Sequence, residues 1–345
     1  MATAKSNLKA LIEKQTPSVR RAFLRMITEM KSEAQITLVV EHLRAGDIGK
    51  AMLALNMDSA FLAPLDGALH SAYLVGGQDA MAGLPRIPDP FTGGRVVARF
   101  DLRNPKAEAH LATISSELVT NLFEPMEASI RAVLADNMAN GVNAKTAALD
   151  MVGRVNELSG KREGGLIGLN KPQIRASQTA NVELLSGDKA QLENYLTRKT
   201  RNKSLDHHVR ASIKSGKPID KRTAKLMIMK MNNKQLIQRG NMIARTELRG
   251  AMNNSKYQAY EQMVDSGKLQ ASQITLIWRK THDSKVRSSH DAMGGQRRTF
   301  GMPFTSGDGY SLKHPLDSSL GAPASETLQC RCDFEAEIDR FAGLT

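Results

Sequence analysis

The sequence contains very little cysteine, few aromatic residues and no long apolar run. Only 2 of its 345 residues are cysteine and 4% are aromatic. No stretch approaches the roughly 18–20 consecutive apolar residues that a membrane-spanning helix needs, and the N-terminus lacks the apolar core and cleavage site of a signal peptide. These absences argue against a disulfide framework and a membrane span, and we expect the chain to be made and kept in a reducing, soluble setting.

Common catalytic signatures are also absent. The sequence has no G-x-S-x-G elbow, Walker-type phosphate loop, dinucleotide fingerprint or H-E-x-x-H motif. A group within ten residues offers an acid, a base and a phosphate clamp for RNA cleavage: His282, Asp283, Arg287, His290 and Asp291. Because no nucleophile setting accompanies this group, the sequence favours a protein that is not an enzyme and has no small-molecule substrate, with RNase or transferase activity as the alternative.

The remaining composition favours helices. The chain is 41% hydrophobic and holds 17 methionines, a combination typical of adaptable helix packing. We predict a mainly α fold with a small α+β C-terminal module, in which short strands and loops follow residue 270. The expected division is a helical N-terminal region (1–160) with an irregular excursion at 76–100, a linker (161–172), a basic helical segment (173–240) and the C-terminal module (241–345).

Apolar periodicity and capping residues locate the N-terminal helices. Thr16-Pro17 predicts the start of a helix that runs to about residue 44, and Asp47 predicts the N-cap of a second helix. A long apolar stripe from Leu111 to Val133 indicates a helix with a kink or break at Pro125. Residues 96–100 are expected to form a short strand.

Similar signals locate the elements of the second half. Asp220 predicts the N-cap of a helix that ends before Gly240, and a second helix then runs from Asn241 to about Asp265, closed by Gly267. The alternation around residues 274–278 predicts a strand that is half-buried at best.

Positive charge is concentrated in one segment of the chain. Residues 171–260 carry 19 Lys/Arg against 6 Asp/Glu, whereas residues 1–170 carry 19 against 18 and residues 261–345 carry 10 against 11. The segment therefore holds the whole net charge of +13. Such a concentration favours a polyanion partner, with a solvated helix face or an acidic protein partner as the alternatives.

We expect non-specific contact with double-stranded DNA, because no motif for base readout is present. The side chains expected to contact phosphate are the densest basic residues of the segment: Arg198, Lys199, Arg201, Lys203, Arg210, Lys214, Lys217, Lys221, Arg222 and Lys225.

Both cysteines belong to a Cys-Arg-Cys sequence near the C-terminus. Cys330 and Cys332, with His282 and His290 upstream, supply four ligands of the kind that structural zinc takes. The spacing is tighter than that of usual zinc motifs, and two buried reduced cysteines that pack as small apolar groups are the alternative. A disulfide between the two would be strained. The expected cofactor is none, with a structural zinc as the open possibility.

The order of motifs in residues 240–335 resembles the phage Mu F-like minor head proteins, the phage head morphogenesis family. An Ala-Arg-Thr-Glu helix leads to an Asn, Gly267, Trp278 and an Asp-x-x-x-Arg-x-x-His run; Gly294-Gly295, Pro303-Phe304 and Cys-Arg-Cys follow. The motif residues are Arg245, Glu247, Trp278, Asp283, Arg287, His290, Cys330, Arg331 and Cys332. Some relatives carry extra cysteines where this chain has Val286 and Ser289, a difference that disfavours the metal site.

The resemblance implies a minor structural protein of a tailed-phage head. Such a protein is made in the host bacterial cytoplasm and lies in the virion, inside the capsid near the portal. It acts in head morphogenesis and in DNA packaging or ejection, and its partners are the portal protein, other head proteins and DNA. The alternative is a phage-carried effector with a toxin-like activity, because some family modules are joined to toxin domains.

Within the C-terminal module we expect structural roles for the motif residues. Glu247 on its helix is expected to pair with Arg287 or Arg331 and so connect the helix to the loops. Trp278, the single tryptophan, is expected to anchor the small core.

Overall fold

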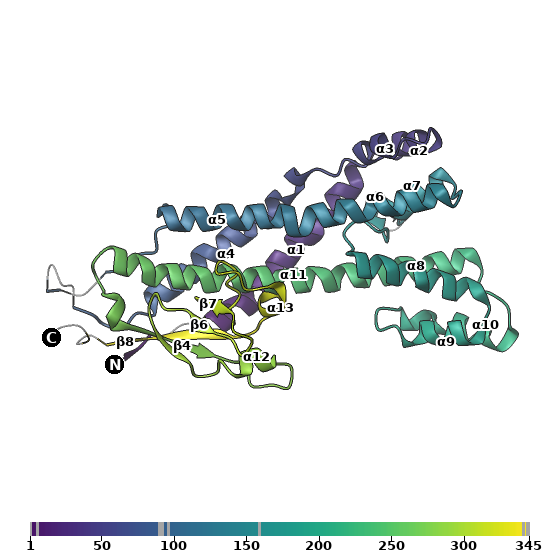
Figure 1. The fold of residues 1–345 in the computed structure, drawn as a ribbon. Helices are drawn as coiled ribbons and strands as arrows, with labels where there is room; N and C mark the ends of the chain where they lie inside the picture. The colour runs from purple at the N-terminus through teal and green to yellow at the C-terminus, as the bar shows by residue number, and fades with distance from the viewer. Residues whose placement is uncertain are drawn as a thin grey trace. The chain divides into compact units, whose positions relative to one another are not determined.

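The computed structural model describes residues 2–4, 7–88, 93–94, 97–157, 160–339 and 342. It is mainly helical with short antiparallel strands near the C-terminus, which confirms the predicted fold class (Figure 1). The longer helices are α1 (Leu8–Glu33), α2 (Ile36–Arg44), α3 (Ile48–Ala54), α4 (Ala63–Ala82), α5 (Pro105–Leu118), α6 (Glu124–Ala139), α7 (Ala144–Val152), α8 (Lys171–Ser186), α9 (Lys189–Thr197), α10 (Asp206–Ser215) and α11 (Lys221–Asp265).

Short elements complete the fold. The 3₁₀ and π segments are η1 (Ser59–Leu62), η2 (Val119–Phe123), η3 (Lys203–Leu205) and η4 (Ala271–Gln273), and two helical turns are α12 (Ser288–Asp291) and α13 (Ala324–Thr327). The strands are β1 (Ala2–Thr3), β2 (Arg154–Val155), β3 (Arg162–Glu163), β4 (Ile274–Arg279), β5 (Arg297–Thr299), β6 (Phe304–Thr305), β7 (Ser311–Leu312) and β8 (Asp333–Ile338).

The chain forms two compact units that both draw on separated stretches of sequence. Unit 1 contains residues 1–20, 65–115 and 241–345, and unit 2 contains residues 21–64 and 116–240. The regions predicted from the sequence follow one another along the chain, whereas each unit combines segments that are far apart in the sequence. Residues 241–345, the expected C-terminal module, thus fold together with two N-terminal stretches in unit 1.

The main sheet of unit 1 has the order β1-β8-β4-β5 and is antiparallel throughout. β8 alternates strictly, with Phe334, Ala336 and Ile338 buried. β4 is more buried than the predicted half-buried strand, because Ile274, Leu276, Ile277 and Trp278 are all nearly inaccessible. The N-terminal strand pairs with the C-terminal one at Ala2 and Ile338, so the chain's first strand completes the module's sheet.

Two predicted boundaries of the first helix were wrong, and at its start an apolar stripe outweighed a local signal. α1 begins at Leu8 and contains Pro17 rather than starting there, since Leu8 and Ile12 extend the buried stripe N-terminally. Thr16 Oγ1 donates to the Ile12 carbonyl at 2.6 Å within this stretch. The expected helix to residue 44 is divided into α1 and α2, and Asp47 caps α3 through the Lys50 amide as predicted.

α11 is continuous through Gly240, where the sequence predicted a stop. Glycine in a helix interior costs only about 1 kcal/mol relative to alanine, which the flanking helix formers tolerate. The Asp220 cap is confirmed by a 2.9 Å bond from the Thr223 amide to Oδ1, and Gly267 follows the helix end in the left-handed region.

Close packing explains why α4 passes through two glycines. The predicted excursion was to begin at residue 76, but α4 continues to Ala82. A Cβ at Gly76 would lie 2.4 Å from Ser255 Oγ, and one at Gly77 would lie 2.3 Å from the Phe100 ring. The glycines therefore allow close approach rather than breaking the helix. Residues 97–100 are not a strand, and Val96 lies outside the described residues.

The chain stays helical through Pro125, where the sequence predicted a kink or break, but its hydrogen-bond pattern changes just before the proline. α5 passes into the π-helical segment η2, and α6 follows with Pro125 in its first turn. Proline lacks the N–H of a continuing helical ladder, so a change of hydrogen-bond pattern just before it is expected.

The expected linker at 161–172 is packed inside unit 2. Leu166, Ile167 and Leu169 are buried. Lys31 Nζ donates to the Gly164 carbonyl at 2.6 Å, and Arg239 donates to the Gly168 carbonyl at 2.7 Å. Its glycines adopt positive φ in a tight turn instead of supplying flexibility.

Candidate functional site

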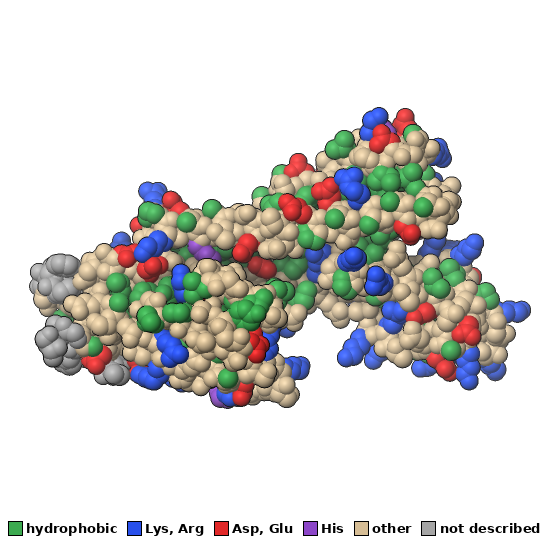
Figure 2. All heavy atoms as spheres, viewed as in Figure 1, with side chains coloured by type: hydrophobic (Ala, Val, Ile, Leu, Met, Phe, Trp, Pro, Cys, Tyr) green, Lys and Arg blue, Asp and Glu red, His purple; other side chains and the backbone are tan. Residues whose placement is uncertain are grey.

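The basic segment folds as helices around a small core of its own within unit 2. α8, α9, α10 and the start of α11 bury a shared apolar cluster: Ala180, Leu184, Leu192, Tyr195, Val209, Ile219, Ala224, Met227 and Met231. The core holds the apolar faces inward, so the cationic side chains extend outward. Figure 2 shows Lys and Arg side chains gathered over α9 and α10.

Eight of the ten predicted phosphate-contacting residues are exposed, and we call this set the basic surface: Lys199, Lys203, Arg210, Lys214, Lys217, Lys221, Arg222 and Lys225. None of the eight forms an ion pair with another residue that the structure describes. Nearby acids are committed elsewhere: Asp188 and Asp220 cap α9 and α11 through backbone amides. No carboxylate among the described residues is therefore paired with a side chain of this surface.

The other two predicted residues have internal partners. Arg198 forms a bidentate pair with Glu183 at 2.7 Å for both contacts. Arg201 pairs with Asp206 at 3.1 Å and also donates to the Arg198 carbonyl. The carboxylates are almost fully buried, with 4% and 8% of their side chains exposed. The structure thus assigns Arg198 and Arg201 to the architecture of the α8–α10 helices, a role that sequence reasoning did not give them.

His290, Cys330 and Cys332 converge in the C-terminal module. His290 lies on α12, and the cysteines lie in the connection between α13 and β8. His290 Nδ1 is 3.3 Å from Cys330 Sγ and 3.6 Å from Cys332 Sγ. All three side chains are buried, and their ligand atoms lie within 4.8 Å of one another. We call this group the thiol–imidazole cluster.

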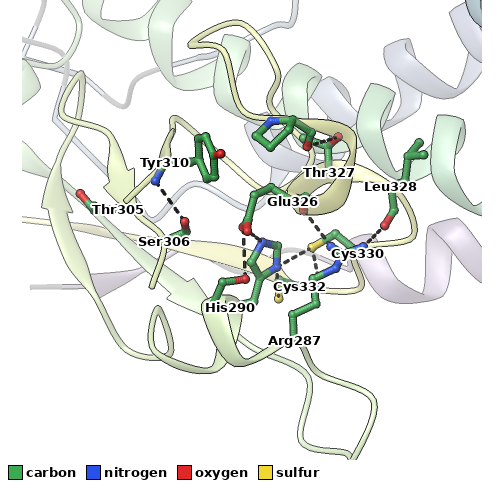
Figure 3. Close-up of polar contacts among 12 residues, drawn as sticks. Arg287, His290, Thr305, Ser306, Tyr310, Glu326, Thr327, Leu328, Cys330 and Cys332 are labelled. Atoms are coloured by element: carbon green, nitrogen blue, oxygen red, sulfur yellow. Dashed lines mark hydrogen bonds and ion pairs between the residues drawn. The ribbon is translucent and has the colours of Figure 1, made fainter. Parts of the chain in front are cut away.

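The other imidazole nitrogen faces a buried carboxylate. Glu326 Oε2 lies 2.9 Å from His290 Nε2 and 3.3 Å from Ser289 Oγ. Figure 3 shows the imidazole between this carboxylate and the two sulfurs. Arg287 fixes the connection that carries them by donating to the carbonyls of Glu326 and Leu328. Histidine, carboxylate and thiols are therefore held by one hydrogen-bonded frame.

The two thiols differ in acidity because they are hydrogen-bonded to each other. The hydrogen bond with the Cys330 thiol lowers the pKa of Cys332. Burial opposes this effect, and the adjacent His290 imidazole lowers the pKa of Cys332 further. The same bond, with burial, raises the pKa of Cys330. The pair therefore favours one thiol with one thiolate over two thiolates.

His282, the fourth predicted metal ligand, does not join the cluster. It is exposed, and the groups that could hold a metal among the described residues contain only His290, Cys330 and Cys332. The residues between His282 and His290 form a loop and the start of α12, so their spacing does not place the two imidazoles close together.

Trp278 anchors the core as expected. It is fully buried and packs edge-on against His290 and Phe304, with ring centroids 5.5 and 5.2 Å apart. Gly295 adopts a positive φ and donates its amide to the Trp278 carbonyl, so the Gly294-Gly295 pair forms a turn beside this core.

The arginines expected to pair with Glu247 have other partners. Arg331 pairs with Asp283 at 2.7 Å, and the guanidinium lowers the pKa of the Asp283 carboxyl to about 2. Arg287 binds backbone carbonyls. The pairing prediction was wrong because the Asp283 carboxylate engages Arg331 and two distant backbone carbonyls engage Arg287. Arg245 is exposed on α11.

Sequence reasoning missed four residues that connect this module. Arg249 on α11 donates to the Arg331 carbonyl at 2.7 Å. Lys256 is buried, donates to the Phe334 carbonyl and lies 4.6 Å from the centre of its ring. Buried His314 bonds with Asn254, and Glu326 holds His290. A polar residue on the apolar face of α11 is the one signal that could have found Lys256.

The fold and the site define a mainly helical protein with an exposed basic surface and a buried thiol–imidazole cluster. The family model of the Phage Mu protein F like proteins matches residues 128–335. The chain belongs to this family, whose members are phage head morphogenesis proteins. The match begins well before the motifs at 240–335 and so includes the basic surface. Neither a curated protein nor a solved structure matches the chain.

Hydropathy adds one finding on the described residues. No helix among them combines the length and the apolar character needed to cross a membrane.

Proposed function

We propose that the chain is a minor structural protein of a tailed-phage head. It lies inside the capsid near the portal and contacts packaged double-stranded DNA through the basic surface. Family membership supports a role in head morphogenesis with other head proteins as partners. The DNA contact, the portal association and the part played in packaging or ejection are the finer elements of the proposal.

One observation carries the DNA contact: eight exposed cations without ion-pair partners among the described residues occupy one small helical body. Phosphate binding by such side chains releases counterions and is independent of sequence. A rigid helical core suits this role, because it holds the charges in place before DNA arrives.

An acidic protein partner would use the same surface, and salt dependence separates the two. If six to eight phosphates are neutralised, log K falls by roughly 5 to 7 per log unit of salt, at about 0.9 per phosphate. We expect fluorescence anisotropy with duplexes of unrelated sequence to give equal affinities and a slope in this range.

A matched pair of variants tests the location. The first variant combines four substitutions on the basic surface: Lys199→Glu, Lys203→Glu, Lys217→Glu and Lys221→Glu. We expect it to lose measurable DNA binding near physiological salt. The control reverses four exposed lysines elsewhere, Lys9, Lys14, Lys145 and Lys285, with the same change in net charge. Arg198 and Arg201 stay unchanged because they hold the helices together. Equal loss in both variants would contradict a localised DNA surface.

An effector activity has weaker support. Thiol, imidazole and carboxylate stand in the order of a nucleophile, its base and an orienting group. Cys330 and Cys332 are only 5% and 3% exposed, however, so a macromolecular substrate has no path to either sulfur.

A further inference from the structure

The thiol–imidazole cluster directs three potential ligand atoms at one small space. His290 Nδ1 has a single lone pair when it is unprotonated, yet both sulfurs approach it at 3.3 and 3.6 Å. One lone pair accepts one good hydrogen bond, so without a cation only one thiol bonds well to Nδ1 and the other thiol bonds to the first. A common acceptor of all three lone pairs, a cation, accounts for both.

The separations match those of a tetrahedral zinc site. Zinc–sulfur distances of about 2.3 Å and zinc–nitrogen distances of about 2.0–2.1 Å at the tetrahedral angle put sulfur and nitrogen about 3.6 Å apart. The observed sulfur–nitrogen separations of 3.3 and 3.6 Å are close to this value, so the side chains would need only a small adjustment to bind the ion. The ligands come from two separate elements, α12 and the connection before β8, and the fold brings them together.

Glu326 prepares the histidine to bind a metal. Its carboxylate lies 2.9 Å from Nε2, so in the neutral imidazole it accepts from Nε2–H and leaves the Nδ1 lone pair facing the sulfurs. Ligating histidines usually donate their other N–H to a carboxylate or carbonyl, and this bond fixes the tautomer and ring orientation. Ser289 Oγ donates to the same carboxylate oxygen, Oε2, at 3.3 Å. Ser289 thus holds the carboxylate instead of supplying a ligand.

We propose that His290, Cys330 and Cys332 bind a zinc-like divalent cation, with the fourth position taken by water or another small ligand. Thiolate and imidazole are the ligands preferred by borderline-soft cations such as Zn²⁺ and Co²⁺, whereas Mg²⁺ and Ca²⁺ prefer oxygen. Two thiolates balance the charge of the cation, which removes the cost of a net charge in this buried place.

A metal at this position would close a long segment of the module. It would join α12 to the residues that lead into β8. It would also help to hold the turn that carries Glu326 and the core around Trp278, because both contact His290. A ligand that binds only the folded state stabilises it in proportion to the logarithm of its concentration over Kd. We therefore expect zinc to raise the thermal unfolding temperature of the full chain.

The single tryptophan gives a direct readout. The Trp278 ring lies edge-on to His290 at 5.5 Å, so a paramagnetic cation in the site will quench its fluorescence. The full chain is reduced, freed of metal with a chelator and titrated with Co²⁺. We expect quenching that saturates at one equivalent, with an absorption band from thiolate-to-cobalt charge transfer that Zn²⁺ then removes. Absence of both signals in the folded wild-type chain would overturn the proposal.

Two variants locate the ligands. Cys332→Ser is expected to weaken Zn²⁺ binding at least 100-fold in competition with a chromophoric chelator. His282→Ala, at an exposed histidine of the same segment, is expected to leave binding unchanged. If His282→Ala abolished binding, or if Cys332→Ser bound as wild type, this ligand set would be wrong. Should Cys332→Ser fail to fold, the charge-transfer band of the wild-type chain still decides whether thiolates bind the metal.

Discussion

The Glu326 carboxylate lies 2.9 Å from His290 Nε2, and the two residues are only 2% exposed. If His290 binds metal through Nδ1, the carboxylate contacts the other ring nitrogen, Nε2, and holds the ring in place. Loss of such an outer carboxylate typically weakens metal binding by about 10–100-fold. We expect Glu326→Gln to lower Zn²⁺ affinity within this range, measured by chelator competition.

Glu335→Gln is the control for that substitution, because Glu335 lies in the same module but is half-exposed and pairs with Arg279. It should leave affinity unchanged. Equal affinities for Glu326→Gln and wild type would show that the carboxylate has no influence on the histidine as a ligand.

The Arg198–Glu183 pair predicts a large stability effect inside the basic segment. Removing one partner of a buried ion pair costs about 3–5 kcal/mol, since the other charge stays buried and unpaired. Glu183→Ala should lower the free energy of unfolding by this amount in urea titrations. Glu193→Ala is the control, because Glu193 is 56% exposed and its contact with Lys189 is 3.9 Å; we expect a change below about 0.5 kcal/mol. Similar values for both would refute an architectural role for Arg198.

Gly307 is expected to tolerate no side chain. Its amide donates to the Ser289 carbonyl at 2.9 Å, and a Cβ there would lie 3.0 Å from the Ser289 Cα. Gly307→Ala should displace α12 and destabilise by about 1–3 kcal/mol. Gly67 in α4 has open space around the same position, so Gly67→Ala should stabilise by about 1 kcal/mol. Thermal unfolding of both variants checks the contrast, and stabilisation by both would contradict the close contact.

Lys31 predicts an alkaline effect on stability. Burial lowers the pKa of its amine to about 8 in the folded protein, against 10.5 in the unfolded chain. Between these values the unfolded chain holds the extra proton, so folding becomes more favourable as pH rises, by at most about 1.4 kcal/mol per pH unit. The stability of wild type relative to Lys31→Met should therefore rise from pH 8 to pH 10 in urea titrations. A constant difference would mean that Lys31 keeps its ordinary pKa.

The sequence predicted those elements whose signals are local. Asp47 and Asp220 cap helices as expected, and the hydrogen-bond pattern of the helix changes just before Pro125. Each effect acts within one helical turn, so neighbouring residues suffice to predict it. Trp278 was identified as the anchor of the module for a related reason, because a lone indole among short strands has few alternatives to burial.

The errors came from interactions between distant residues. Gly76 and Gly77 look like helix breakers until Ser255 and Phe100 are placed against them. Glu326 has no sequence signal that links it to His290, since a turn far along the chain brings them together. The pairing of β1 with β8 joins the two ends of the sequence, and no periodicity within either segment reports it.

The basic surface shows what a count of charged residues along the sequence can predict and what it cannot. The count located the segment, and eight of ten residues are exposed as a DNA contact requires. It could not separate Lys199, which extends into solvent, from Arg198 next to it, which is held by Glu183. A guanidinium suits buried bidentate pairing better than an ammonium does, which agrees with both internal pairs using arginine.

Quantitative mass spectrometry of purified particles, from the phage that encodes the chain, tests the central claim most directly. DNA-filled particles are expected to contain the protein at a few copies beside the many copies of the major capsid protein. The same measurement after triggered DNA release shows whether it leaves with the genome or stays in the head. Its absence from the filled particles would contradict a structural role in the phage head.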